Sequence, residues 1–240
     1  MPVAAIPVAA MPVGTVRNGA GRLRQGRHAM AGAKDREAVR DLLKTHGRTY
    51  ADEADIRLKD TPQPLYRLLV LANLLSARIR SDIALATARA LAEAGLRGPR
   101  QMAKATWQQR VDALGRGGYR RYDERTSTQL GEGAERLIED YGGDLRRLRK
   151  AADGDIDELR GGLLRTPGLG PVGADIFLRE VQGVWPEVAP YLDSKAQEGA
   201  RRAGLPEDPK ALARLADDTG ADPATFAAAL VRAGLEPSKG

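Results

Sequence analysis

The 240-residue sequence predicts an all-α protein, and three observations lead to this prediction. Alanine, leucine and arginine dominate the composition, and all three favour helix. Apolar residues recur three and four positions apart along most of the chain, as in helices with one buried face. No stretch has the alternating pattern of a half-buried strand. We therefore expect a helical bundle, arranged as two lobes with a cleft between them.

The composition also excludes several kinds of site. The chain has no cysteine, so it forms no disulfide, thiolate nucleophile, cysteine-ligated zinc site or iron–sulfur cluster. Its two histidines, His28 and His46, are far apart in sequence and do not indicate a metal site. No apolar run reaches the length that spans a bilayer, and no segment resembles a signal peptide. We expect a cytoplasmic protein with no membrane partner.

The first 34 residues differ in composition from the rest. They repeat Met-Pro-Val and Pro-Val-Ala-Ala, continue into a Gly/Arg stretch, and contain 5 of the 38 basic residues but no acidic one. The remaining chain therefore has 33 basic and 32 acidic residues, and its net charge is only +1. We expect residues 1–34 to form a disordered basic tail. Any surface that binds nucleic acid on the folded part, residues 35–240, must then be a local patch.

Start and stop signals divide the rest of the chain into helices. Ser, Thr and Asp commonly cap helix starts, glycine commonly ends a helix, and proline is tolerated in the first turn. On these signals we expect helices from Asp35 to about His46, from the Pro62/Pro64 pair to Ile79, from Ser81 and Asp82 to Gly95, from Thr106 to Leu114, from Tyr119 to Tyr141 (ended by Gly142 and Gly143), from Asp144, from Asp155 or Asp157, from about Asp193, and over about 207–218 and 222–234.

A stretch of glycines and prolines, Pro-Gly-Leu-Gly-Pro (167–171), separates two of these helices. Glycine and proline at this spacing cannot continue a helix, so a tight hairpin is expected. The second helix would then begin with unpaired backbone N–H groups and the positive end of its dipole, and a phosphate suits such a place. A plain turn between two packed helices is the alternative that this stretch leaves open.

Four segments follow one another at consistent intervals: Leu-Leu-Ser-Ala-Arg-Ile-Arg-Ser-Asp (74–82), Gly118-Tyr119-Arg120, Leu-Arg-Thr-Pro-Gly-Leu-Gly-Pro-Val-Gly-Ala-Asp (164–175) and Leu192-Asp193-Ser194. Together they resemble the endonuclease III branch of the helix-hairpin-helix DNA glycosylases. The corresponding family segments are Leu-Leu-Ser-x-Gln-x-x-x-Asp, Gly-x-Tyr, Leu-Pro-Gly-Val-Gly and Val-Asp-Thr. The resemblance extends from about residue 64 to about residue 235.

The resemblance implies a two-lobed fold around a helix-hairpin-helix motif and a cleft, with one lobe at about 64–155 and the other at about 35–60 plus 156–240. It implies that Asp193 is catalytic and that a monovalent cation binds the hairpin carbonyls, as in the family. It also implies DNA contacts from Arg78, Arg80, Tyr119, Arg120, Pro167, Gly168, Leu169, Gly170, Val172, Gly173 and Lys195.

The chain departs from the family at several positions. Val172 stands where the bifunctional members have the lysine that forms a Schiff base with the sugar, and valine has no nucleophile. The C-terminal cysteine cluster that holds an iron–sulfur centre in many members is missing. Arg78 replaces the glutamine that fills the gap left by an extruded base, and Lys195 replaces a histidine. These departures predict a divergent member that uses water instead of lysine, with weak or absent lyase activity.

Asp193 has two interpretations. As the base leaves, positive charge develops on the deoxyribose, and a carboxylate can stabilise this charge or activate the attacking water. The sequence Leu-Asp-Ser-Lys at the start of a helix is also ordinary capping chemistry, and both roles can hold together.

The basic and aromatic residues have similar alternatives. Arg78 and Arg80 follow the apolar helix and would face the duplex, or they are two exposed arginines near a helix end. Aromatic and basic residues interleave from Tyr119 to Arg125, which suits stacking and phosphate contact but also a solvated helix face. Lys195 would project from a different side of its helix than Asp193, so we expect it to be solvated or to pair with a phosphate.

The sequence therefore predicts a monomeric, nucleoid-associated DNA N-glycosylase that acts on double-stranded DNA and excises a damaged or mismatched base without a metal. The alternative is a DNA-binding protein that keeps the scaffold without the chemistry. A third possibility is a helical interaction module that does not bind DNA.

Overall fold

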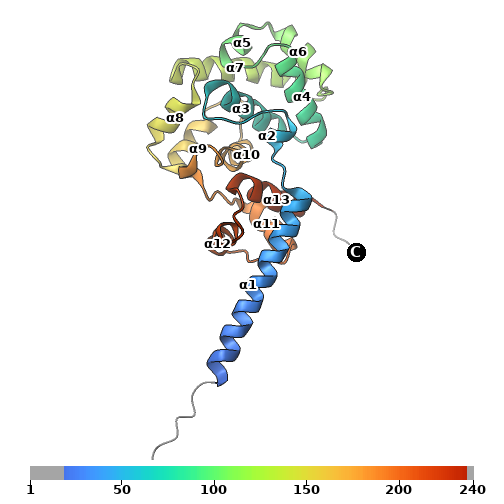
Figure 1. Ribbon diagram of the computed structural model, residues 1–240. Coiled ribbons are helices and arrows are strands. Elements are labelled where there is room, and N and C mark those ends of the chain that lie inside the picture. The colour runs from blue at the N-terminus through green and yellow to red at the C-terminus, as the bar shows by residue number, and fades with distance from the viewer. Residues whose placement is uncertain (1–18, 237–240) are drawn as a thin grey trace, which may run out of the picture.

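The computed structural model describes residues 19–236 of the chain, with side chains from residue 32 onward. This range folds into helices and contains no strand, which confirms the all-α prediction. In Figure 1, α2–α10 form a larger group at the top, and α1 and α11–α13 form a smaller group below it. The elements are α1 (Gly19–His46), α2 (Tyr50–Glu53), α3 (Pro62–Ser76), α4 (Ser81–Glu93), α5 (Pro99–Lys104), α6 (Trp107–Arg116), α7 (Asp123–Tyr141), α8 (Leu145–Ala152), α9 (Ile156–Leu164), α10 (Pro171–Val181), the 3-10 turn η1 (Pro186–Val188), α11 (Ser194–Arg202), α12 (Pro209–Thr219) and α13 (Pro223–Leu235).

Most helices begin and end at residues that local chemistry predicted. Thr106 and Gln109 form a reciprocal capping box at the start of α6, with hydrogen bonds of 3.1 and 2.8 Å. The carboxylates of Asp144 and Asp155 accept hydrogen bonds from first-turn amides of α8 and α9. Gly142 ends α7 in the left-handed region, at φ 63°. These boundaries depend on contacts within a few residues, which a sequence pattern contains.

The N-terminal helix is longer than expected. It begins at Gly19, inside the segment for which we expected disorder, while residues 1–18 of that segment lie outside the described residues. Val39 and Leu42 anchor its C-terminal half in a hydrophobic cluster. The preceding turns contain alanine, arginine, leucine and glutamine, which favour helix, and four glycines (19, 21, 26 and 32), which do not. Extending an existing helix costs far less than nucleating one.

Three other boundaries differ from the expected ones. The apolar helix α3 ends at Ser76 and not at Ile79. Arg80, and not Ser81 or Asp82, occupies the N-cap position of α4. Residues 119–122 are a loop, so α7 begins at Asp123. The short helices α2 and α5 have 4 and 6 residues, too few to give a recognisable period in the sequence.

The apolar side chains form two clusters that divide the chain differently from the expected lobes. The first cluster contains residues from Tyr50 to Val188 around α3, and it includes α9 and α10 because α10 packs directly on α3. The second cluster joins α1 to α11, α12 and α13. The boundary between the two clusters therefore follows Val188, and residues 156–188 belong with the larger group.

A buried glutamate links α10 to the start of α2. The Glu180 side chain is buried, and its two carboxylate oxygens accept hydrogen bonds of 3.1 and 2.8 Å from the amides of Tyr50 and Ala51. Burial raises the pKa of this carboxyl above its usual value, although the two amides, Arg179 and Arg232 oppose the shift. Glu180 therefore caps α2 from α10, and burying its carboxylate away from water is unfavourable.

The raised pKa predicts how stability depends on pH. The folded chain holds the Glu180 proton more tightly than the unfolded chain, so this group stabilises the fold less as pH rises from its usual pKa of 4.5 through its folded value. We expect the free energy of unfolding of the wild type, relative to Glu180→Gln, to fall over that range. Urea unfolding of both proteins at a series of pH values measures this difference, with the exposed Glu135→Gln as the control. A difference that rises with pH would contradict the predicted shift.

Candidate functional site

The turn between α9 and α10 has the tight geometry that the sequence predicts. The amides of Thr166 and Leu169 donate to the carbonyls of Leu163 and Thr166, each at 3.0 Å. Gly168 has φ +82°, a conformation that side chains other than glycine rarely adopt. Gly170 then occupies the N-cap position of α10 without a side-chain cap, and proline takes the first helical position. The first turn of α10 thus has backbone N–H groups that no side chain caps.

Two residues for which we expected DNA contacts, Leu169 and Gly173, also fix the turn against the core. Leu169 is only 3 % exposed and belongs to the first cluster. A side chain at Gly173 would begin 2.6 Å from Leu169 Cδ1 and 3.4 Å from the Ala72 carbonyl oxygen, so glycine lets α10 approach α3 closely. Pro167 lines a small cavity of about 20 Å³ beneath the turn. These residues hold the turn in place, while Gly168, Gly170 and Val172 face outward.

A groove of about 500 Å³ opens beside this turn. Its walls come from the end of α3, the loop before α7, the first half of α7 and the start of α10. A volume of this size falls within the usual range for ligand sites. The lining residues are Asn73, Ser76, Ala77, Arg78, Tyr119, Tyr122, Arg125, Thr126, Gln129, Gly168, Gly170, Pro171 and Val172.

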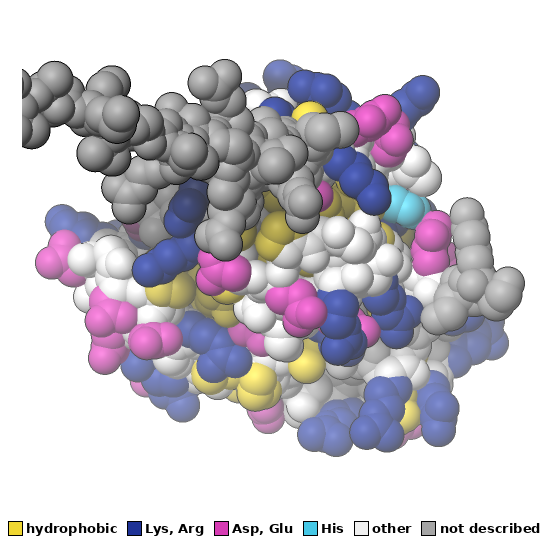
Figure 2. All heavy atoms as spheres, turned by 90° about the horizontal axis from the view of Figure 1, so that it is seen from below, with side chains coloured by type: hydrophobic (Ala, Val, Ile, Leu, Met, Phe, Trp, Pro, Cys, Tyr) yellow, Lys and Arg dark blue, Asp and Glu magenta, His cyan; other side chains and the backbone are white. Residues whose placement is uncertain are grey.

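The groove is basic although residues 35–240 together are nearly neutral. Arg78 and Arg125 are the charged residues among those that line it, and both are exposed. Neither forms an ion pair with another described residue. On the face of the molecule seen in Figure 2, by contrast, basic and acidic side chains are mixed. The groove is thus a local concentration of positive charge on a nearly neutral body.

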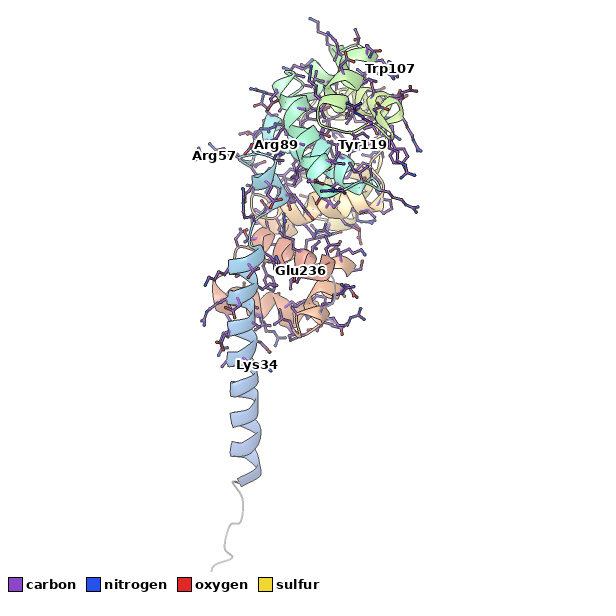
Figure 3. All side chains as sticks on the ribbon, turned by 90° about the vertical axis from the view of Figure 1, so that its right-hand side faces the viewer. Lys34, Arg57, Arg89, Trp107, Tyr119 and Glu236 are labelled. Carbon is purple, nitrogen blue, oxygen red and sulfur yellow. The ribbon has the colours of Figure 1, made fainter. Side chains whose placement is uncertain are left out.

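Tyr119 forms part of the groove floor. Its side chain is 3 % exposed, and its hydroxyl accepts a hydrogen bond of 3.1 Å from the Thr126 hydroxyl. Burial raises the pKa of the Tyr119 phenol above its usual value, so the ring stays neutral. Val172 stands at the rim and is 58 % exposed, which is unusual for a valine beside a core. Figure 3 shows Tyr119 in the upper body, far from Lys34 on α1.

Besides Pro167, Leu169 and Gly173, three predicted contact residues lie outside the lining of the groove. Arg80 makes a bidentate pair with Asp82, at 3.0 and 2.7 Å, so its charge is already matched. Arg120 is exposed in the loop before α7. Lys195 is exposed on the first turn of α11. The sequence pattern did not indicate this exposed pair between Arg80 and the carboxylate two residues further on.

Asp193 is held in an ion pair. Its carboxylate is 9 % exposed and binds Arg179, whose side chain is 8 % exposed. One oxygen, Oδ2, accepts from the Arg179 guanidinium, and the other, Oδ1, accepts from the Ala196 amide at 3.1 Å. Asp193 is therefore the N-cap of α11, as one interpretation of the sequence expected. It is not among the residues that line the groove.

Side chains of α10, of its C-cap residue Gln182 and of α9 fix the loop that carries Asp193. The Gln182 amide accepts a hydrogen bond of 2.8 Å from Tyr191 N and donates to Tyr191 O at 3.3 Å. The Tyr191 hydroxyl donates to Asp175 at 2.7 Å, and Arg160 donates to the same oxygen at 2.8 Å. Burial, followed by the hydrogen bond to Asp175, raises the pKa of the Tyr191 phenol. The position of Asp193 thus depends on contacts along the whole of α10.

Sequence reasoning missed several groove residues, above all Asn73, Thr126 and Gln129. Asn73 gave one signal, because it is the single polar residue between Leu68 and Leu75 in an otherwise apolar helix. Thr126 and Gln129 gave none, because polar residues are common on helix surfaces. Thr126 and Gln129 lie in the groove because α7 packs closely against the turn. A Cβ added at Gly133 of α7 would lie only 3.2 Å from Thr166 Cγ2.

Among the residues that the structure describes, no group of three His, Cys, Asp or Glu side chains is placed to hold a metal ion. No helix in the same residues combines the length and the apolar character needed to cross a bilayer. Comparisons of the chain with known protein families, with curated proteins and with solved structures find no match.

Proposed function

We propose that this protein binds double-stranded DNA in the groove between α3, α7 and the start of α10. The observation that carries the proposal is the composition of the groove. It is lined by two exposed arginines and no carboxylate, and it adjoins uncapped amides at the start of an 11-residue helix. Arginine side chains and helix N-termini are the groups that most often bind the phosphates of DNA.

Each part of the groove suits a particular contact. In this proposal α9, the turn and α10 act as a helix-hairpin-helix motif, whose amides at Val172 and Gly173 bind one phosphate. Nothing lies within 4 Å of the place where a side chain at Gly170 would begin, so a phosphate can approach the backbone there. Arg78 and Arg125 bind neighbouring phosphates from the opposite wall. Backbone contacts of this kind fix the position of the protein without selecting a sequence.

The arginines provide the test of this proposal. We expect Arg78→Gln and Arg125→Gln each to weaken binding about equally on all duplex sequences. Each should also reduce the slope of log Kd against log salt concentration by about 1, because one phosphate contact is lost. Fluorescence anisotropy with labelled duplexes at several salt concentrations measures both quantities. Arg214→Gln is the matched control, since Arg214 is an exposed arginine on α12 outside the groove.

A glycine variant in the same titrations tests the turn. Gly170 has an ordinary φ of −81° and open space where a Cβ would lie, so Gly170→Val should keep the fold and lose about 1 kcal/mol or less, the cost of a poorer N-cap residue. The new side chain would block the approach to the amides and weaken binding. Full affinity in this variant and in both arginine variants would refute the proposed interface.

The second candidate function is excision of a base with Asp193 and water, without a lysine. One observation favours it: Arg179, the partner of Asp193, lies seven residues after Val172, on the same face of α10 and about 10 Å along its axis. The carboxylate therefore lies on the side of α10 that leads to the rim of the groove. For catalysis, Arg179 would have to release Oδ2 to the attacking water.

A further inference from the structure

One large aromatic side chain lies on the surface of the protein. Trp107, the first residue of α6, is 41 % exposed, whereas the other tryptophan, Trp185, is 0 % exposed. Every other aromatic residue that the structure describes is buried or partly buried. An exposed tryptophan is typical of a binding surface, because its ring gains most from contact with a partner. Trp107 is not among the residues that line the groove, so it indicates a contact outside it.

Local contacts hold the ring of Trp107 in place. Its indole N–H donates a hydrogen bond of 3.3 Å to the carbonyl of Glu124 on α7. Its own carbonyl accepts a hydrogen bond of 2.9 Å from the hydroxyl of Ser127, which is buried. The capping box of Thr106 and Gln109 fixes the start of α6. A ring held in this way loses little entropy on binding, and because its one polar group is already bonded it offers a partner an apolar aromatic surface.

Trp107 lies next to the wall of the groove. Its partner Glu124 directly precedes Arg125, which lines the groove, and α6 packs against α7. Figure 3 shows Trp107 and Tyr119, a residue of the groove lining, in the same upper part of the molecule. A strand of nucleic acid that leaves the groove across the first turn of α7 therefore meets this ring.

The charges beside Trp107 suit a base better than a phosphate. Residues 120–125 contain three arginines and two carboxylates, so their net charge is only +1. One of these carboxylates belongs to Glu124, whose carbonyl binds the indole. A phosphate gains little at such a place, whereas an aromatic ring stacks on a base of any kind. In a paired duplex neighbouring bases cover these faces, so the base must come from an unpaired strand.

We propose that Trp107 stacks on a base of the unpaired strand where duplex DNA held in the groove continues into a single strand. This inference rests on the proposed binding of DNA, and it names the substrate class as a duplex with a single-stranded extension. Arg78 and Arg125 bind phosphates of the duplex part, and Trp107 takes a base beyond the junction. No base leaves a duplex in this arrangement, because the strand beyond the junction is already unpaired.

The test compares three DNAs by fluorescence anisotropy: a blunt duplex, the same duplex with a short thymidine overhang, and the same duplex with an overhang of tetrahydrofuran abasic units. We expect the wild type to bind the thymidine overhang about tenfold more tightly than the abasic one. Trp107→Ala should remove this preference and keep the affinity for the blunt duplex, which also shows that the variant is folded. Trp107→Phe should keep part of it, because phenylalanine also stacks. Leu235→Ala, at another exposed apolar residue, should change nothing.

The intrinsic fluorescence of the protein gives an independent readout. Stacking on a base quenches the emission of an indole, so the thymidine overhang should quench the wild type more than the abasic overhang does. Trp107→Phe retains Trp185 alone, which is 0 % exposed, and its emission should not respond to either DNA. Overhangs at the 5′ and the 3′ end are both measured, since either strand can continue past the groove.

The outcomes separate this inference from the proposed function. Equal affinity of the wild type for the thymidine and abasic overhangs would overturn the inference and leave DNA binding in place. An unchanged preference in Trp107→Ala would also overturn it. Absence of binding to all three DNAs would overturn the proposed function, and the inference with it. If Trp107→Ala fails to fold, the quenching decides the result, and a wild type that the thymidine overhang does not quench refutes the stacking.

Discussion

Asp193→Ala is expected to lower the free energy of unfolding by about 3–5 kcal/mol. The substitution leaves the Arg179 guanidinium, whose side chain is 8 % exposed, without its carboxylate. An unpaired charge in such a place costs far more than the loss of a surface ion pair. The same substitution removes the N-cap of α11, which contributes about 1 kcal/mol in typical helices. Urea unfolding followed by circular dichroism measures the change.

Two further variants identify the cause of the stability loss in Asp193→Ala. Arg179→Met combined with Asp193→Ala should be more stable than Asp193→Ala alone, because no buried charge remains. Asp193→Asn should lose less stability than Asp193→Ala, since asparagine is also a good N-cap. A loss below about 1 kcal/mol in Asp193→Ala would show that the pair is solvated and that the carboxylate is free for other uses.

These variants also decide the second candidate function. A loss of excision in Asp193→Ala would have two explanations, because the fold is weakened at the same time. Asp193→Asn keeps the cap and removes only the ionised carboxylate, so it is the informative variant. If the wild type excises a base from any duplex in a panel of lesions, excision should disappear in Asp193→Asn while DNA binding persists. A wild type that binds and never excises leaves DNA binding as the function.

Gly199→Ala is expected to destabilise the protein by about 3 kcal/mol, the upper end of the usual range for overpacking. The new Cβ would lie 1.7 Å from the carbonyl oxygen of Leu230, a backbone atom of α13 that cannot move alone. Gly234 contributes to the same close crossing, because its own added Cβ would lie 3.1 Å from Gly199 Cα. The helices α11 and α13 would have to separate, and the second cluster would open. Thermal and urea unfolding measure the loss.

Gly161→Ala is the control for this prediction. Gly161 lies inside α9, is exposed and has nothing within 4 Å of the place where a side chain would begin. The substitution should therefore stabilise the protein by about 0.5–1 kcal/mol, as alanine does in a free helical position. Equal stability of Gly199→Ala and the wild type would mean that α11 and α13 are not in close contact in solution.

The sequence predicted those features of the fold that short-range chemistry determines. Thr106, Asp144 and Asp155 cap helices because each bonds amides two or three residues away, so the pattern alone is sufficient. The division of the apolar clusters was not predictable in this way. The contact of α10 with α3 joins segments about a hundred residues apart, and periodicity cannot indicate which buried face meets which.

The residues of the candidate site also fall into those that the sequence indicated and those that depend on contacts between distant segments. Gly168 and Gly170 were identifiable because a turn between helices needs residues of their kind, and Arg78 and Tyr119 were found through the resemblance. Asn73 and Gln129 both approach Gly168 because two helices meet at the turn, and an isolated polar residue does not reveal its neighbour. The contact between Asp193 and Arg179 was missed because it forms across the loop that follows α10.

The second hydrophobic cluster has a consequence for synthesis on the ribosome. It joins Val39 and Leu42, near the start of the chain, to residues of α11–α13 at its end. At about 5–20 residues per second, roughly 10 to 40 s pass between translation of α1 and of α13. The first cluster contains only residues from Tyr50 to Val188, so it can fold during this interval. The apolar residues of α1 remain exposed on the nascent chain until α11–α13 have been made. Among the described helices, α13 is translated last, and it packs against α1.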